Sequence, residues 1–516
     1  MSADATARPT TGDDAPMSAL EVDGLGAELG TLGESTSHDY STSLSGGIVP
    51  LDRRRSAVSM GALWLALSGG VAGLLIGYTF YQAGMTFWET AGVVAAGGLI
   101  YIFVYALWAD YLGSRTGMTS ALITRTVFGR YGSWAVSLCQ AAFGLGFVGF
   151  IAIVSAELYS GLFGWRDSTE LAMIVAASAV VTNLFGFTGV ITWARYVVGP
   201  VFLLWVGYMF VRTLATDPAR FSVHPKTTAS LSVLAAVAVI LGGATWGDEA
   251  DFWRYGKPAY WWPTLPLLFG LVFGAIPIVC AGWLMAAASG GGFAGSIGFI
   301  TNYSLFGAVW LAFLVGTITQ QALQDGNYYI GINALQNLLG GIRGWRRIYS
   351  CALAAAAATF FTWLLRQSSD AWVTFLQFIA ATVPSATVIA VTDHFLVPRL
   401  FGLSRPLTRV PSWEQAGGVN VPAVVALACA VFVGVAGNGQ FPWWGLKGQF
   451  WYVPAVLAWL TAFVVYVAGV ALVRGRADAL KWLAYPERWR NAPGNSVVHV
   501  DQPIDLASDD RLVASE

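Results

Sequence analysis

Charged side chains are scarce in this sequence: they make up 11% of its 516 residues, whereas hydrophobic residues make up 56%. An average soluble protein has about 25% charged and about 45–50% apolar residues. The composition therefore argues against a water-soluble globular domain. The net charge of −1 gives no indication of a nucleic-acid partner, and we expect none.

Motifs for catalysis are also missing. The sequence has no metal-ligand spacing, no phosphate-binding loop and no nucleophile–base constellation. We therefore expect no enzyme activity, no cofactor and no ATP-driven transport by this chain alone. The cysteines stand singly within apolar stretches and are interpreted as core residues; they are Cys139, Cys280, Cys351 and Cys429.

Long apolar runs dominate the chain instead. A helix that spans a bilayer needs about 20 mostly apolar residues, and the runs are solidly apolar rather than alternating, which favours helices over a β-barrel. Hydropathy predicts about twelve spans, at 62–82, 90–112, 134–162, 170–187, 195–213, 231–249, 263–285, 299–325, 348–366, 371–396, 421–437 and 453–473. The more polar stretch 327–342 is predicted to be an interfacial helix between the eighth and ninth spans.

The predicted organisation has a membrane domain between two tails. Residues 1–55, rich in Ser, Thr, Gly and Asp, are expected to be a disordered cytoplasmic tail, 56–475 the transmembrane transporter domain, and 476–516 a second cytoplasmic tail. With the N-terminus inside, 20 Lys and Arg residues flank the spans on the inner side and 6 on the outer side. The positive-inside rule therefore predicts a plasma-membrane protein with both termini cytoplasmic.

Two spans are interrupted by glycine. Residues 68–73 (SGGVAG, with Gly69 and Gly70) lie midway in the first span, and residues 241–247 (LGGATWG, with Gly243) in the sixth. The interruptions lie five helices apart, so the two halves have opposite topology. Paired broken helices in inverted repeats indicate the central site of a transporter, because unwound backbone can bind ions and polar ligands. Close helix packing at glycine is the alternative explanation.

Ionisable residues within spans are costly in lipid and are candidates for function. Asp248 follows the glycine interruption of the sixth span. It could bind a substrate N–H, bind a cation or carry a proton; pairing with inner-loop arginines is the alternative. Asp251 is close to Arg254 in the chain and is expected to pair with it. Asp110, at the inner end of the second span, is expected at the membrane interface.

The eighth span carries a polar cluster, TQQALQD, at residues 319–325. Gln321 and Gln324 are candidate substrate ligands, because an amide both donates and accepts hydrogen bonds, as a heterocyclic amide requires. Thr319 and Asp325 are candidates for binding the coupling ion. Hydrogen bonding between helices is the alternative. Asp393-His394, which closes the tenth span, is interpreted as a gate or packing feature rather than a proton relay.

Three segments carry a family resemblance. Residues 113–119 (GSRTGMT), continued by 124–134 (TRTVFGRYGSW), resemble the loop between spans two and three of the nucleobase–cation symporter family that contains the cytosine permeases. Residues 249–255 (EADFWRY) are similar to the end of that family's sixth span, and 372–396 to its tenth. The similarity extends from about residue 60 to 475.

The resemblance implies a five-plus-five inverted-repeat core, leucine-transporter-like, with broken helices 1 and 6 and two additional helices. It also implies import of a nucleobase or related heterocycle (purine, pyrimidine, allantoin, hydantoin or a vitamin precursor) together with Na⁺ or H⁺. Members bind a flat substrate between aromatic side chains of spans three and six. By alignment these fall on Phe147 and, one turn beyond the expected position at Gly242, on Trp246.

The sequence departs from the family at several positions. The family's span-three amide falls on Ile151, and the hydroxyls that complete its sodium site fall on Ala322 and Leu323. Loss of oxygen ligands favours H⁺ over Na⁺, with the proton on Asp248 or Asp325. A transporter of the same fold for another solute, such as a vitamin or an amino acid, is the alternative, and a channel or receptor is a further one.

Overall fold

The computed structural model describes residues 48–49, 51–68, 70, 72–225, 231–289, 299–339, 342, 347–367, 382–405, 416–437 and 454–485. The regular secondary structure of these residues is helical, apart from one isolated β-bridge between Asn420 and Leu483. The predicted all-α class is therefore confirmed. Residues 1–47 and 486–516, which make up most of the two predicted tails, lie outside the described residues.

The described helices include short 3₁₀ and π stretches, labelled η. In chain order they are η1 (Leu51–Arg53), α2 (Ala57–Ser68), α3 (Ala72–Gln82), α4 (Phe87–Ile100), η2 (Tyr101–Ala106), α5 (Leu107–Thr116), α6 (Ser120–Phe163), α7 (Thr169–Ser178), η3 (Ala179–Phe185), α8 (Gly186–Trp193), η4 (Ala194–Val198), α9 (Gly199–Thr216), η5 (Pro218–Ser222), α10 (Val233–Ala244), α11 (Glu249–Trp253), α12 (Thr264–Gly270), η6 (Leu271–Ala275), α13 (Ile276–Ser289), η7 (Phe299–Ser304), α15 (Val309–Leu339), α16 (Arg347–Arg366), residues 382–391, η8 (Thr392–Leu396), α18 (Val397–Phe401), α19 (Val421–Gly437), α20 (Pro454–Val473) and α21 (Ala479–Trp482).

Six continuous helical stretches of the described residues are long and apolar enough to cross a membrane, and a bent pair, α2 with α3, makes a seventh. Two shorter apolar helices are α10 and α19. One of the six, Thr169–Thr216, has 48 residues, about twice the length that a single crossing requires. Gly186, with φ of +69°, turns the chain within it. The count of twelve spans stays a prediction.

Both glycine-rich interruptions are breaks in the structure. Helix α2 ends at Ser68, α3 begins at Ala72, and the two axes differ by 49°. In the second interruption Gly243 is still helical, and the break lies between Ala244 and Glu249, in the second half of the glycine-rich stretch. Gly247 adopts a φ of +79° there, a conformation that glycine accepts without a steric penalty.

Helix α15 corrects one expectation. The stretch 327–342 does not form an interfacial helix: α15 continues without interruption to Leu339, and residues 327–337 are buried. The polar residues of this stretch are buried because other helices satisfy them. Asn337 donates from Nδ2 to the Ser137 hydroxyl at 2.8 Å and accepts at Oδ1 from Arg125 Nε, also at 2.8 Å.

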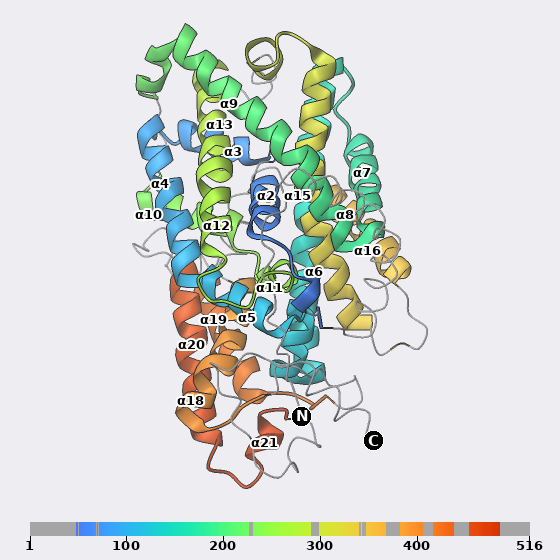
Figure 1. Ribbon diagram of the computed structural model, residues 1–516, viewed down its shortest axis with the longest axis vertical. Helices are drawn as coiled ribbons and strands as arrows, with labels where there is room; N and C mark the ends of the chain where they lie inside the picture. Colours follow the sequence, from blue (N-terminus) through green and yellow to red (C-terminus); the bar gives the residue numbers. More distant parts are fainter. Residues whose placement is uncertain are drawn as a thin grey trace, which may run out of the picture.

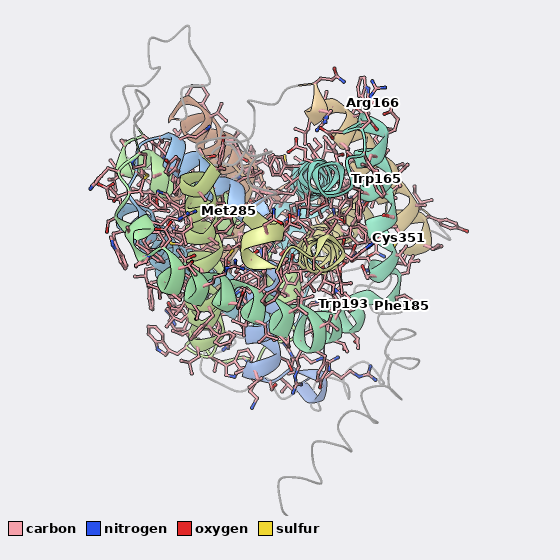
Figure 2. The ribbon with its side chains drawn as sticks, turned by 90° about the horizontal axis from the view of Figure 1, so that it is seen from above. Trp165, Arg166, Phe185, Trp193, Met285 and Cys351 are labelled. Atoms are coloured by element: carbon pink, nitrogen blue, oxygen red, sulfur yellow. The ribbon has the colours of Figure 1, made fainter. Side chains whose placement is uncertain are left out.

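The two broken helices lie inside the bundle. Figure 1 shows α2 and α11 in the middle, with α12 and α13 on one side and α6 and α15 on the other. Helix α2 packs against α12 and α15, and α6 packs along α15. Viewed along the long axis in Figure 2, α6 and α15 are seen end-on, side by side. This arrangement brings both breaks to one region of the interior.

Residues 479–485, which the sequence assigns to a tail, pack against the helical domain. The side chains of Leu483 and Tyr485 are buried, and Arg405 donates from Nη2 to the Leu483 carbonyl at 2.7 Å. Arg405 also forms a buried ion pair with Asp393, with 2.6 Å between Nε and Oδ2. Tyr466 donates its hydroxyl hydrogen to the other oxygen of Asp393. In the described residues, Asp393 therefore holds helices together at the end of the tenth predicted span.

Candidate functional site

A cavity of about 160 Å³ lies where the two helix breaks meet. Its walls come from both broken helices and from the helices around them. The lining residues are Trp64, Leu67, Ser68, Gly73, Ile76, Val94, Gly98, Tyr101, Ile102, Phe147, Ile151, Ile240, Gly243, Ala244, Trp246, Leu267, Gly270, Leu271, Ala275, Ile278, Val279, Leu323 and Asn327. None of these residues carries a formal charge. An uncharged, mostly apolar wall favours a neutral ligand with a large apolar face.

Aromatic rings form one part of the wall. Trp64 of α2 meets Trp246 of the second break edge-on, with ring centroids 5.8 Å apart and an interplanar angle of 77°. The Trp246 indole donates from Nε1 to the Gly243 carbonyl at 3.1 Å, which fixes the ring at the end of α10. Phe147 of α6 also lines the cavity, as the sequence predicted. These rings offer flat faces to a flat ligand.

A few polar groups also line the cavity. Asn327 of α15 donates from Nδ2 to the Leu323 carbonyl at 2.8 Å, and no residue of the described part of the chain donates a hydrogen bond to its Oδ1. Ser68 donates its hydroxyl hydrogen to the Trp64 carbonyl at 2.8 Å. The Asn327 oxygen can therefore accept an N–H of a bound ligand.

Glu249, the first residue of α11, holds the second break in shape. Its Oε1 accepts the backbone N–H of Trp246 at 3.0 Å, and its Oε2 accepts the hydroxyl hydrogen of Tyr105 at 3.0 Å. Thr387 donates its hydroxyl hydrogen to the Gly247 carbonyl at 2.7 Å. The spacing of three residues is that of the glutamate contact in a helix capping box, although the N-cap of α11 is Asp248 rather than Trp246. This spacing was available in the sequence, yet Glu249 was not among the candidates.

Asp248 does not line the cavity. Its side chain is buried, and Oδ1 accepts a hydrogen bond from Gln140 Nε2 of α6. Neighbouring Asp251 accepts the backbone N–H of Ser120 at 2.8 Å and interacts electrostatically with Arg254. The hydrogen bond to Gln140 therefore links Asp248, which lies within the break, to α6. The role of Asp248 in ion coupling stays a prediction.

The polar cluster of α15 faces η3 rather than the cavity. Gln321 donates from Nε2 to the Ala179 carbonyl at 3.0 Å and to Asp325 Oδ1 at 2.7 Å. Thr182 of η3 donates its hydroxyl hydrogen to the same Asp325 oxygen. These bonds join two helices, which is the alternative that the sequence left open for this cluster.

The other candidates also lie apart from the cavity lining. Thr319 donates its hydroxyl hydrogen to the Val315 carbonyl of its own helix at 2.9 Å. Gln324 is buried, and its Nε2 has no partner among the residues that the structure describes. Gly70 packs against Leu323 and the Gln320 side chain. Gly69 lies outside the described residues. The site roles of all these residues stay predictions.

Asp110 is enclosed by the protein, and its expected depth at the membrane interface stays a prediction. Its side chain is fully buried in α5. The close packing of α5 on α11 explains the burial: a Cβ atom added to Gly113 would lie 2.6 Å from the Ala250 Cα. Trp64 and Tyr101 are further cavity residues that sequence reasoning missed, because an aromatic residue in an apolar span carries no distinguishing signal.

Comparison with known proteins connects this chain to one family. The model of the family of permeases for cytosine/purines, uracil, thiamine and allantoin matches residues 49–462. The cytosine permease of Escherichia coli (strain K12) is 25% identical over 222 residues, which are 42% of this chain and 51% of that protein. The match therefore spans about half the length of the curated relatives, which include the cytosine permease of a second Escherichia coli strain, O157:H7, with the same values.

Solved structures share the fold. A closed conformation of Mhp1, a nucleobase-cation-symport-1 family transporter with bromovinylhydantoin bound, has a TM-score of 0.66 at 19% identity and covers 86% of this chain and 99% of that one. Its inward-facing conformation has a TM-score of 0.62 at 18% identity, with 83% and 94% covered. A Na⁺-coupled sialic acid symporter reaches 0.55 at 11% identity, with 87% and 97% covered.

Proposed function

Because the chain belongs to the family of permeases for cytosine/purines, uracil, thiamine and allantoin, we propose that it imports a nucleobase or a related heterocycle, such as a purine, pyrimidine, allantoin or hydantoin, by proton symport. The chain is a multi-pass membrane transporter rather than an enzyme. The class of substrate and the identity of the coupling ion are the two points that we propose.

The observation that carries the proposal is the aromatic cavity between the two helix breaks. Its volume is about 160 Å³, and an engineered cavity of about 150 Å³ in another protein holds one benzene molecule. A single heterocyclic ring therefore fits. Trp64, Trp246 and Phe147 supply apolar faces, and Asn327 supplies an acceptor for a ring N–H.

The uncharged lining of the cavity also argues against the alternative solutes. An amino acid or a cationic vitamin carries formal charges that would lose their hydration in the cavity, and burying an unpaired charge is strongly unfavourable. Since no charged residue lines the cavity, a neutral heterocycle is favoured. A transporter of the same fold for another solute remains the second candidate, and a channel or receptor the third.

Proton coupling is supported by two residues of α15. Ala322 and Leu323 stand where the family's sodium-site hydroxyls are expected, and neither offers a side-chain oxygen. Na⁺ is a hard cation that prefers oxygen ligands, as Ca²⁺ and Mg²⁺ do. Asp248, Asp325 and Thr319 remain the proposed residues for coupling, although Asp325 already has hydrogen-bond partners on η3.

The topology belongs to the same proposal. Twelve spans in a five-plus-five inverted repeat, with both termini cytoplasmic in the plasma membrane, are supported by the two breaks five predicted spans apart and by the 20-to-6 distribution of basic residues. Substrate and coupling ion in such folds bind near the middle of the membrane at the broken helices.

A ligand screen tests the proposal. The purified full-length protein in detergent is heated with adenine, cytosine, uracil, allantoin, hydantoin or thiamine, at several pH values and with or without Na⁺. We expect at least one neutral heterocycle to raise the melting temperature, more strongly at low pH and independently of Na⁺. A shift with thiamine alone favours the second candidate. No shift with any compound contradicts the proposed substrate class.

A further inference from the structure

Two buried carboxyl groups lie on helices α5 and α11, which pack against each other. Gly113 of α5 packs directly on Ala250 of α11. Asp110 is three residues before Gly113 and shares its helix face, while Glu249 directly precedes Ala250. The two carboxylates act on each other electrostatically. Both side chains are fully buried, with 0% exposure.

Within the described part of the chain, no basic side chain is paired with these carboxylates. Neither carboxylate forms an ion pair with an arginine, lysine or histidine of the described residues. Glu249 accepts hydrogen bonds from Trp246 and Tyr105, whereas both oxygens of Asp110 lack a partner in the part of the chain that is described. Two carboxylates that share an apolar interior cannot both stay ionised without a cation.

The surroundings of the pair are uncharged or acidic. The titratable groups that face it or adjoin it are Tyr101 and Tyr105 of η2, Asp248 of the break and, next to Asp248, Asp251 of α11. The cations nearest in the chain are Arg254, which acts on Asp251, and Arg115 of α5, which donates from Nη1 to the Tyr111 hydroxyl at 2.8 Å. Trp459 of α20 and Thr387, which contact Tyr105 or the break, do not titrate.

Glu249 is also connected to the cavity. Its Oε1 holds the backbone N–H of Trp246, and the Trp246 side chain lines the cavity. Tyr101 lines the same cavity and interacts electrostatically with both carboxylates. A carboxylate accepts stronger hydrogen bonds than a neutral carboxylic acid. A proton on the pair therefore loosens the bond that positions Trp246.

We propose that Asp110 and Glu249 hold one exchangeable proton between them, and that this proton is the coupling ion that sets the conformation of the second break. In this step an O–H bond forms at a carboxylate oxygen, one O–H bond of a hydronium ion from the outer solution breaks, and no electrons are transferred. The proton leaves to the inner solution after the break has changed shape. This inference rests on the transport function proposed above.

A first experiment detects the proton without any substrate. Infrared difference spectra of the purified full-length protein, recorded while pH is changed, report the C=O stretch of a protonated carboxylic acid. The wild type is expected to show such a band, and Asp110→Asn and Glu249→Gln are each expected to lose or shift it. Asp478→Asn, which changes an exposed carboxylate between α20 and α21, is the matched control. A band unchanged in both variants overturns the inference.

A second experiment measures coupling. In proteoliposomes at zero membrane potential, one proton per substrate lets a gradient of one pH unit concentrate the substrate about tenfold. The probe is whichever of adenine, cytosine, uracil, allantoin or hydantoin binds best in the screen. We expect accumulation to fall from about tenfold to about onefold in Asp110→Asn, while counterflow exchange of the same probe continues. Tenfold accumulation in both Asp110→Asn and Glu249→Gln overturns the inference.

The two experiments separate the inference from the proposed function. If no compound binds or enters proteoliposomes with the wild type, the substrate class is wrong, and the infrared band still tests the shared proton. If a compound is transported with a pH gradient and both variants remain coupled, the transport function stands and the proton site is wrong. Both Asp110→Asn and Glu249→Gln are made because, if one variant misfolds, the other still tests the proton site.

Discussion

The indoles of Trp64 and Trp246 meet edge to face, with centroids 5.8 Å apart, although they are 182 positions apart in the chain. Trp64 lies on α2, less than two turns before the first break, and Trp246 lies within the second. Their contact joins the two interrupted helices directly at the cavity. A ligand between the breaks therefore contacts both halves of the proposed repeat.

Removal of the Trp246 ring is expected to weaken ligand binding. Stacking of a base on an aromatic side chain contributes about 1–3 kcal/mol, so Trp246→Ala should reduce affinity about 5- to 150-fold. Trp246→Phe should retain most of it. Isothermal titration with the best compound of the screen measures both, and Trp261→Ala, at a 66% exposed tryptophan, is the control. Equal affinity in Trp246→Ala places the ligand elsewhere.

Gly247 is expected to be essential for the second break. Its φ of +79° costs a residue with a side chain about 1–2 kcal/mol, and a Cβ atom would lie 2.9 Å from the backbone carbon of Val383. Gly247→Ala should lower thermal stability and abolish ligand binding. Gly207→Ala, on the exposed face of α9 where nothing lies within 4 Å, should raise stability by up to about 1 kcal/mol. Thermal unfolding compares them, and an unaffected Gly247→Ala shows that the break tolerates a side chain.

Asp325 is expected to contribute to stability through η3. Asp325→Ala leaves the half-buried Gln321 amide and Thr182 hydroxyl without their shared acceptor, at a cost of about 1–3 kcal/mol. Asp325→Asn keeps an acceptor oxygen and should be milder. Both are measured by thermal unfolding and by uptake across a pH gradient. If Asp325→Asn is stable but uncoupled, Asp325 carries the proton after all.

The Asp393–Arg405 ion pair is expected to be far more important than a surface pair. Both side chains are at most 2% exposed, and loss of one partner leaves a buried charge at a cost of about 3–5 kcal/mol. Arg405→Ala should therefore unfold the protein at a clearly lower temperature. Arg220→Ala removes the more exposed pair with Asp217, worth about 0–1 kcal/mol. Similar melting temperatures for the two variants contradict the packing role assigned to Asp393.

Asp248→Asn tests the path by which a proton reaches the Asp110–Glu249 pair. Asp248 adjoins Glu249, interacts with it electrostatically, and is held by Gln140. We expect the initial rate of pH-driven accumulation to fall at least about tenfold, while counterflow exchange and the infrared band of the pair are retained. Normal accumulation in this variant removes Asp248 from the proton pathway.

Much of the fold could be predicted from apolar run length, because lipid requires such runs to be helical. The predicted span 421–437 coincides with α19, and 453–473 starts one residue before α20. The second break lies in the second half of the glycine-rich stretch 241–247 that the sequence indicates, and it extends to Asp248. Gly243 looks like a helix breaker in the sequence, yet the break depends on Gly247 and on the Glu249 side chain, which accepts the Trp246 N–H.

The site was harder to predict because its partners are distant in the chain. Asn337 and Arg125, bonded at 2.8 Å, are 212 residues apart, so the polar second half of α15 looked interfacial. The glutamine cluster was read as a ligand site because the sequence does not show that Thr182 faces it. Trp64 and Tyr101 were missed because many aromatic residues occur in these spans, and only packing distinguishes those that reach the cavity.

The most direct measurement is uptake of a radiolabelled heterocycle from the screen into proteoliposomes that contain the full-length protein. The account predicts saturable accumulation above equilibrium when the outside is acidic, loss of that accumulation with a protonophore, and no requirement for Na⁺. Uptake that never exceeds equilibrium, or that depends on Na⁺ and ignores the pH gradient, would contradict proton-coupled transport through the cavity between the two broken helices.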